Sequence, residues 1–513
     1  MTSSSPSAVP DVPVLIAGGG PVGLATALEL AHHGVRSVVI EPRTAVSSLR
    51  PRAKTTSART MELFRRWHLA DAVRAKAHLP VSWSDQAVFT TGLLGREITR
   101  VNGCFGLDLV GDDRAAEAGQ QIPQPTIEQV LRDAVQASPH ATLRTGWTVG
   151  TVVEDAAGVT AQLRDSDGAH RQVRAEYLVG ADGASSRIRS AIGAVYQGSA
   201  DERPNFNIVF RAPGLAEKVR HGPAVHYWVL SPEQPGVLGR LDLDQTWWAI
   251  AQGVDAEQGN ADPLGLVRDL VGAPIDAEIV ATDPWTAKML LASHYATDRV
   301  FLAGDAAHLN PPWGGHGFNT GIGDAVNLGW KLAAVLNGWA APNLLRSYQS
   351  ERRPIAEQTI AEATRNMATL APELADPRLG GTDEQFDAVH ADVADAVHRA
   401  KDSEFHSLDL VLGYTYQGSP IVSAKAGGRL PHRWLSPGES RYDHLGPGFT
   451  LIGDVTPDLA REFTEAAAAE RIPLTLFADP SCQPGLVRPD QHLAWVDGDP
   501  GTPREILRRA TGH

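Results

Sequence analysis

Three glycines in Gly-x-Gly-x-x-Gly spacing are the first residues in the chain that could do chemistry. Gly18, Gly20 and Gly23 follow a short apolar run at 12–17, which predicts a buried strand that turns into a helix. The first glycine permits a tight turn, the second lets the backbone approach a pyrophosphate, and the third lets the helix pack closely. Glu41 follows a second apolar run, at roughly the twenty-residue spacing expected of an acid that binds ribose hydroxyls. The pattern predicts a dinucleotide site, and the acid disfavours a 2′-phosphate, which leaves FAD and NAD.

A second glycine-rich segment lies almost three hundred residues further along the chain. A short strand expected at 300–303 ends at Gly304-Asp305, where a carboxylate could accept a hydrogen bond from a ribitol hydroxyl. The stretch 311–319 is too rich in Gly and Pro for a helix or a strand, and its glycines let the backbone pass close to a flat ring. We expect a helix at 319–336, whose N–H groups would point at the electron-rich edge of a reduced flavin. The two segments together favour FAD.

A third segment, at 177–189, reads as a strand that runs into Asp182-Gly183 and then a helix. The three segments in this order resemble the FAD-dependent aromatic hydroxylases, the single-component flavoprotein monooxygenases of the p-hydroxybenzoate hydroxylase type. The sequence at 446–451 is typical of longer members, which hydroxylate phenols or aromatic polyketides. Further local matches are Arg52-Ala53, Arg59-Thr60-Met61-Glu62-Leu63, Gln124-Pro125-Thr126-Ile127-Glu128 and Glu351-Arg352-Arg353-Pro354.

The resemblance implies a reaction. NAD(P)H would reduce the FAD, O₂ would give a flavin C4a-hydroperoxide, and a phenolic or polyketide-type aromatic substrate would take up the distal oxygen. NAD(P)H would bind transiently, which agrees with the absence of a second Gly-x-Gly-x-x-Gly. Baeyer–Villiger insertion or epoxidation with the same flavin chemistry stays open as an alternative. So does a non-catalytic flavoprotein that sequesters an aromatic ligand.

The resemblance also assigns roles to residues. Glu41 would hold the adenosine ribose, Asp305 the ribitol, and Asp182 would serve both the flavin and the nicotinamide. Arg52 and Gln124 would contact the region from the pyrophosphate to the isoalloxazine. Val149, at an expected strand end, would touch the adenine, and the loop residues at 315–319 would border the flavin ring. The predicted cofactor-binding residues are Gly18, Gly20, Pro21, Val22, Gly23, Glu41, Arg43, Arg52, Gln124, Val149, Asp182, Asp305, Pro312, Gly315, Gly317, Phe318 and Asn319.

His316 departs from the family pattern, in which this position is often Gln. An ionisable ring there could help to deprotonate a phenol, and His316 is therefore the candidate catalytic residue, with a spectator loop histidine as the alternative. The bulk of Trp313 in the same loop would narrow the pocket beside the flavin. The candidate substrate residues, each of which could equally be core or sheet surface, are His226, Trp228, Arg240, Trp248 and Trp313.

The predicted fold combines α/β and α+β parts. We expect a discontinuous Rossmann-like FAD domain, an antiparallel-sheet substrate domain with strands near 205–211, 224–230, 236–243 and 246–253, and a thioredoxin-like C-terminal domain. The expected ranges are 1–80, 110–190 and 285–370 for the FAD domain, 81–109 and 191–284 for the substrate domain, 371–407 for a helical connection and 408–513 for the C-terminal domain. Within the connection, 383–407 reads as one helix. The C-terminal domain lacks Cys-x-x-Cys, so that disulfide chemistry is not expected of it.

Composition excludes several other classes. A net charge of −14 without a basic stripe argues against a nucleic-acid-binding protein. The two cysteines, Cys104 and Cys482, fit neither a disulfide framework nor a metal site, and they suit a reducing cytoplasm. The uncharged stretch 12–28 follows Asp11 and is interrupted by Gly and Pro, so that a signal or membrane segment is not expected. We expect a small aromatic substrate and O₂ as partners, no metal, and leave homo-oligomerisation open.

Overall fold

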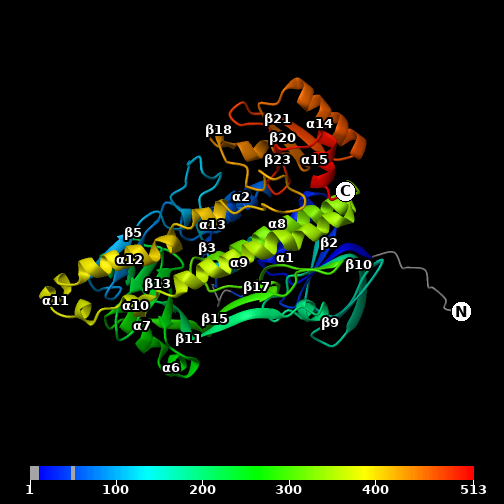
Figure 1. Ribbon diagram of the computed structural model, residues 1–513. Coiled ribbons are helices and arrows are strands. Elements are labelled where there is room, and N and C mark those ends of the chain that lie inside the picture. The colour runs from blue at the N-terminus through cyan, green and yellow to red at the C-terminus, as the bar shows by residue number, and fades with distance from the viewer. Residues whose placement is uncertain (1–10, 48–51) are drawn as a thin grey trace.

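The computed structural model describes residues 11–47 and 52–513. Figure 1 shows the long helices α8 (His316–Leu336) and α9 (Ser347–Met367) crossing the molecule, with the C-terminal part, coloured orange to red, packed on one side of them. Two large sheets lie on the other side. One belongs to the dinucleotide-binding region, and the other is the sheet expected to cover the substrate.

The first sheet places the ends of the three glycine-rich segments together. Five parallel strands have the order β7-β2-β1-β10-β16, and β10 also pairs antiparallel with β9, which pairs with β8. The carboxyl ends of β1, β10 and β16 meet at one edge, which is where a doubly wound sheet binds its ligand. These strands are β1 (Val12–Ala17), β2 (Ser37–Glu41), β7 (Ala141–Thr145), β8 (Trp147–Asp155), β9 (Gly158–Asp165), β10 (His170–Gly180) and β16 (Val300–Leu302).

Two helices start at this edge, and both start earlier than their sequences indicated. Helix α1 (Pro21–His32) begins at Pro21, because proline is well suited to the first helical position. Helix α8 begins at His316 rather than at residue 319, after Gly315 in the left-handed conformation (φ 70°). The prediction of irregular structure over 311–319 was therefore wrong in its second half, and His316 and Asn319 belong to the first turn of α8.

The second sheet has the order β17-β15-β11-β14-β13-β12-β4-β5. All neighbours are antiparallel except β12 and β4, which run parallel, so the expected antiparallel sheet has one parallel pair. Strand β15 runs continuously through residue 285, where the sequence suggested a change of domain. The strands are β4 (Ala87–Thr90), β5 (Glu97–Val101), β11 (Tyr196–Arg211), β12 (His226–Val229), β13 (Gly236–Arg240), β14 (Thr246–Gln252), β15 (Glu278–Ala292) and β17 (His308–Leu309).

The single helix expected at 383–407 is two helices, α11 (Asp383–Asp387) and α12 (His390–Phe405). The sequence has no Gly or Pro at the break. Instead, Phe386 stacks on His390 with ring centroids 5.1 Å apart, and Phe386 packs into a buried cluster with Val389. Tertiary packing, which local propensity does not encode, sets this break.

The C-terminal part has the strand and helix order expected of a thioredoxin-like unit. Parallel strands β20 (Phe449–Gly453) and β21 (Leu474–Ala478) flank α14 (Pro457–Glu470), and two antiparallel strands and a helix follow. Phe449 packs against Trp330 of α8 at 6.1 Å between ring centroids, which anchors this unit on the long helix. The remaining elements are β22 (Gly485–Val487), β23 (Leu493–Val496) and α15 (Pro503–Ala510).

Within residues 11–47 and 52–513, no helix combines the length and apolar character needed to cross a membrane. The same residues contain no group of three His, Cys, Asp or Glu side chains placed to hold a metal ion. Cys104 and Cys482 are both free thiols.

Candidate functional site

The first glycine turn packs so closely that side chains cannot be added. Gly18 has φ 105°, and a Cβ there would lie 2.2 Å from the carbonyl oxygen of Ala181 at the end of β10. A Cβ on Gly23 would lie 1.9 Å from the carbonyl oxygen of Gly18. At Gly20, in contrast, no atom of residues 11–47 or 52–513 lies within 4 Å of such a Cβ, so its backbone is open to them on that side. The turn therefore leaves room at Gly20 for the close approach of a ligand, and the contact that the motif predicts there stays a prediction.

The first and second glycine segments touch each other directly. Val22, in the first turn of α1, lies 2.8 Å from the position that a Cβ of Gly304 would take and 2.7 Å from that of Gly321 in α8. Pro21 is buried at the start of the same helix. Two glycines therefore let α1 and α8 approach around Val22.

Glu41 lies at the end of β2 and is buried beside the glycine turn. One carboxylate oxygen accepts a hydrogen bond from the Gly19 N–H at 2.7 Å. The other oxygen accepts bonds from the backbone N–H of Arg43 at 3.0 Å and from its guanidinium at 2.7 Å. Glu41 therefore holds the shape of the turn, a role that its spacing alone did not indicate. Its predicted contact with a ribose stays a prediction.

Asp182 follows β10 and caps the short helix α5 (Arg187–Ala191). Its carboxylate accepts hydrogen bonds from the backbone N–H groups of Arg187 at 2.7 Å and Ile188 at 3.2 Å, and from the Ser186 hydroxyl. The residue is half-buried, so its proposed contacts with flavin and nicotinamide remain compatible with this capping role.

Asp305 follows β16 at the same edge of the first sheet. It is exposed to solvent, yet the protein surrounding its carboxyl raises its pKa, although His308 and Arg52 oppose that shift. Arg52 itself is exposed, with φ 30°. The backbone N–H of Gln124 donates to the carbonyl oxygen of Ala53 at 2.8 Å, which brings Gln124 to this segment.

The loop that carries Asp305 is held from behind by Asp324 of α8, which no sequence motif indicated. Asp324 is fully buried and accepts hydrogen bonds from the Gly304 N–H at 3.0 Å and from His308 at 2.9 Å. Its other oxygen accepts from the Arg352 guanidinium at 2.8 Å. Burial opposes its ionisation, but Arg352 and His308 outweigh burial and lower the pKa of Asp324.

The first turn of α8 faces strand β3 (Thr55–Thr56). Asn319 accepts a hydrogen bond from the Ser57 N–H at 2.9 Å and donates to the carbonyl oxygens of Thr55 at 3.2 Å and Gly315 at 2.6 Å. Asn319 thus positions the helix start. Phe318 packs on the main core, Gly317 lies beside Asn310, and Pro312 is exposed.

His316 is buried in this first turn, and the structure weakens its predicted catalytic role. Among the residues that the structure describes, its Nε2 finds no hydrogen-bond partner, and burial lowers its pKa to about 4. An imidazole that holds a proton this weakly is a poor acceptor for the proton of a phenol. His316 lines a small pocket, partly open to solvent, together with Phe105 and Asn319.

Four of the five candidate substrate residues gather on one face of the second sheet, which we call the site face. His226 lies 5.4 Å from Trp248, and Trp228 lies 5.6 Å from Trp313, between ring centroids. The site face lies next to the start of α8, because Trp313 stands in the loop before this helix. Lys54, which directly precedes β3, also reaches the site face, since its ammonium lies 4.2 Å from the centre of the Trp248 ring.

Arg240, a candidate substrate residue, and Val149, a candidate adenine contact, lie away from the site face. The Arg240 guanidinium donates to the carbonyl oxygen of Asp242 at 2.9 Å and covers Trp247 at 5.3 Å, on the opposite face of the sheet. Residues alternate between faces along a strand, which separates Trp247 from Trp248. Val149 is buried in the main core on β8. The structure does not bring Arg240 to the site face.

The residues present fit FAD. The N-cap residues of α1 and α8 are the glycines Gly20 and Gly315, so neither helix has a side-chain cap, and neither has an acidic residue in its first turn. Their free N–H groups and positive helix ends therefore remain available to phosphates and to an electron-rich ring. Gly20 is open for backbone approach, and Asp305 is exposed directly after β16 at the same edge of the sheet.

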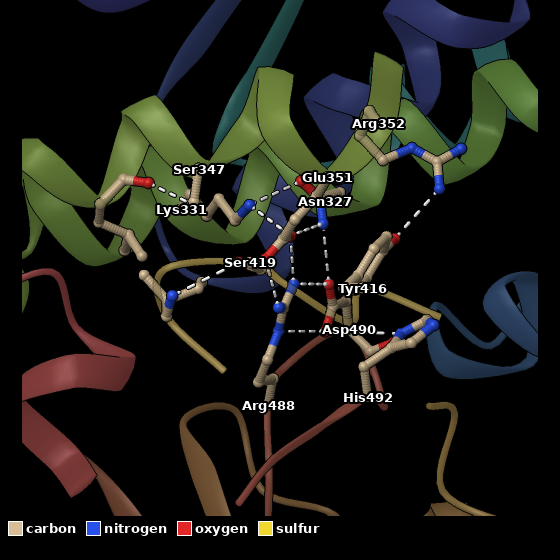
Figure 2. A network of polar contacts seen from close by, with 12 residues as sticks. Asn327, Lys331, Ser347, Glu351, Arg352, Tyr416, Ser419, Arg488, Asp490 and His492 are labelled. Atoms are coloured by element: carbon tan, nitrogen blue, oxygen red, sulfur yellow. Dashed lines mark hydrogen bonds and ion pairs between the residues drawn. The ribbon is translucent and has the colours of Figure 1, made fainter. Parts of the chain in front are cut away.

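A buried polar network joins α8 and α9 to the C-terminal part. Figure 2 shows Arg488 between Glu351 of α9 and Asp490. Its guanidinium donates to both Glu351 oxygens at 2.7 and 2.8 Å and to both Asp490 oxygens at 3.0 and 2.6 Å. Lys331 of α8 also pairs with Glu351 at 2.6 Å, and Arg352 donates to the Tyr416 hydroxyl at 3.1 Å. The C-terminal part thereby supports α8, the helix that carries Asp324.

Comparisons with known proteins agree with this geometry. The family model described as "FAD binding domain" matches residues 11–363. A 2,4-dichlorophenol 6-monooxygenase of Delftia acidovorans is 30% identical over 96% of this chain and 91% of its own, and a tetracenomycin B2 monooxygenase-dioxygenase of Streptomyces olivaceus is 33% identical over 91% and 88%.

Solved structures give the same result. The rebeccamycin biosynthetic enzyme RebC with reduced flavin superposes with a TM-score of 0.89 at 34% identity, over 98% of this chain and 99% of its own. Aklavinone-11 hydroxylase with FAD and aklavinone gives 0.83 at 27% identity, over 99% and 100%. The resemblance to the FAD-dependent aromatic hydroxylases is thereby confirmed. The chain belongs to the FAD binding domain family and is an FAD-dependent monooxygenase.

Proposed function

We propose that this monooxygenase hydroxylates a phenolic or polyketide-type aromatic substrate, with NAD(P)H as the reductant. One atom of O₂ enters an aromatic C–H bond to give C–OH. The other atom leaves as water, with two electrons from NAD(P)H, which becomes NAD(P)⁺, and one proton from solvent. Two free thiols and an acidic net charge suit a cytoplasmic setting for this chemistry.

The observation that carries the proposal is the position of the site face opposite the start of α8. Bound FAD would supply the acceptance of hydride and the activation of O₂, chemistry that side chains lack. The protein would position the cofactor and the substrate. The first turn of α8, Asp305 and the glycine turn would hold the cofactor, while Trp228 and Trp248 present a flat apolar surface for an aromatic ring.

Trp313 would exclude water between these two parts. It is 5% exposed and lies between Trp228 and Trp285, at 5.6 and 6.4 Å between ring centroids. A dry site favours transfer of oxygen to the substrate over loss to water.

Reductant consumption tests the proposal. Holoenzyme would be mixed with NADH or NADPH and a panel of phenols, naphthols and hydroxyanthraquinones, with product followed by mass. We expect one aromatic class to stimulate NAD(P)H oxidation and to gain one oxygen. Binding of an aromatic compound without stimulated NAD(P)H oxidation would instead support sequestration. A lactone product would support Baeyer–Villiger insertion, and an epoxide product would support epoxidation.

A further inference from the structure

Lys54 carries an unneutralised charge on the site face. It precedes β3, and its ammonium lies 4.2 Å from the centre of the Trp248 ring. Across residues 11–47 and 52–513, its side chain forms no hydrogen bond or ion pair. Burial lowers its pKa to about 8, with no carboxylate acting in the other direction. A desolvated ammonium without a counterion is costly unless a ligand compensates it.

The pocket beside Lys54 places an aromatic ring next to the ammonium. It is partly open to solvent, and Trp248 and Val209 line it together with the polar residues Asn207 and Thr282. The other charged residues that line it are Arg52, from the same segment, and Asp283 of β15, which makes a contact of its own. Asp283 does not neutralise Lys54, because burial alone accounts for the shift in the pKa of Lys54.

The neighbouring ionisable groups do not supply a counterion either. His226 is held neutral, since burial, Lys54 and Lys401 lower its pKa to about 3. Lys401, which lies 4.4 Å from the centre of the Trp228 ring, differs from Lys54 because it pairs with Glu404 at 2.8 Å. Of these two lysines on the site face, Lys54 is the one left for a ligand.

We propose that Lys54 determines specificity by binding an anionic oxygen, phenolate or carboxylate, on a planar aromatic substrate that lies along Trp248. This inference rests on the proposed function for the substrate class. For a phenol, the O–H bond breaks, the proton leaves to solvent, and the electron pair stays on the oxygen beside the ammonium. The phenolate is the form of the ring that is electron-rich enough to attack an electrophilic oxygen.

A phosphate of the cofactor is the alternative partner of Lys54, since Arg52 lines the same pocket. Isothermal titration of the holoenzyme would separate the possibilities with three ligands of one size: 2-naphthol, 2-naphthoate and 2-methoxynaphthalene. The variants are K54M, K54R, which keeps the charge, and K218M as a matched loss of an exposed lysine. FAD occupancy of each variant is measured first from its absorbance.

At pH 7, below the pKa of Lys54, wild type should prefer the anions over 2-methoxynaphthalene, and 2-naphthol should release about one proton on binding. K54M should weaken that preference by about 10- to 100-fold, the strength of a charge-assisted hydrogen bond, and abolish the proton release. K54R and K218M should behave like wild type. A loss confined to 2-naphthol or to 2-naphthoate identifies the oxygen as phenolate or carboxylate.

Three results would overturn the inference: an unchanged preference in K54M, the absence of any anion preference in wild type, or loss of FAD from K54M, which would assign Lys54 to the cofactor. These are binding measurements, so they stand apart from turnover. If the wild type hydroxylates and K54M keeps the preference for anions, only the role of Lys54 is refuted. If the wild type turns over no substrate, the proposed function is refuted.

Discussion

Arg488→Met should destabilise the contact between the C-terminal part and helices α8 and α9 more than any exposed ion-pair change. Arg488 is fully buried and binds two carboxylates, Glu351 and Asp490, through four hydrogen bonds. In the variant, Glu351 still has Lys331 at 2.6 Å, but Asp490 keeps only the Asn327 amide at 3.1 Å and a distant histidine. The variant therefore leaves a buried carboxylate without a cation at hydrogen-bond distance.

Removing one partner of a buried pair costs about 3–5 kcal/mol. With a urea dependence of about 3 kcal/mol/M, the unfolding midpoint should fall by more than about 1 M. The double variant R488M/D490N removes the uncompensated charge and should recover most of the loss. Burial raises the pKa of Asp490, and Arg488 and His492 together outweigh burial and lower it. Without Arg488 the carboxyl takes up a proton at higher pH in the folded protein than in the unfolded chain, so the stability that the single variant loses should be partly regained as the pH falls.

The assay is urea unfolding at pH 7 followed by both tryptophan fluorescence and FAD release, since a protein of several parts need not unfold in one step. The matched control is R378M, because Arg378 is 60% exposed and pairs with Asp376 at the surface, where about 1 kcal/mol or less is expected. If R488M loses no more stability than R378M, or if D490N fails to rescue it, the network does not hold the C-terminal part in place.

Three further predictions concern the cofactor, the candidate base and pH. Asp305→Ala should weaken FAD binding by about 10- to 100-fold, seen as loss of yellow colour on purification, and full occupancy would remove its assigned role. His316→Gln should leave the pH profile of hydroxylation unchanged above pH 5, because the low pKa keeps this ring neutral there; a shifted profile would restore it as a base. Burial opposes ionisation of Glu29, but Arg66 and His33 outweigh it and lower its pKa to about 2. Its contribution to stability is therefore present above pH 4.5 and lost as pH falls towards 2, and R66M should reduce stability at pH 7 much more than at pH 3 in urea titrations.

The sequence was most informative where backbone chemistry restricts the residue type. Gly18 and Gly23 could be read correctly, because only glycine tolerates the close approach of Ala181 and of the turn itself. Buried parallel strands are continuous apolar runs, and β1 and β16 were predicted to within one residue for the same reason. Such constraints are local, so one sequence is enough to reveal them.

The parts that could not be predicted depend on contacts between distant segments. Asp324 and Lys54 look like ordinary charged residues, and their roles appear only when α8 and the second sheet bring Gly304 and Trp248 to them. The sequence held one indication for Lys54, because this residue directly follows Arg52-Ala53, which matches the family. Arg240 was misleading because the pattern of a short strand does not show which face points to the site.

The central claim, that this protein places one oxygen atom on an aromatic ring, is tested most directly by the mass of the product formed under ¹⁸O₂. Holoenzyme, reductant and the substrate found in the panel should give a product heavier by one ¹⁸O atom, with the aromatic ring intact and with one NAD(P)H consumed for each product. Oxygen that derives from water, a ring-expanded lactone, or binding without any product would contradict the account.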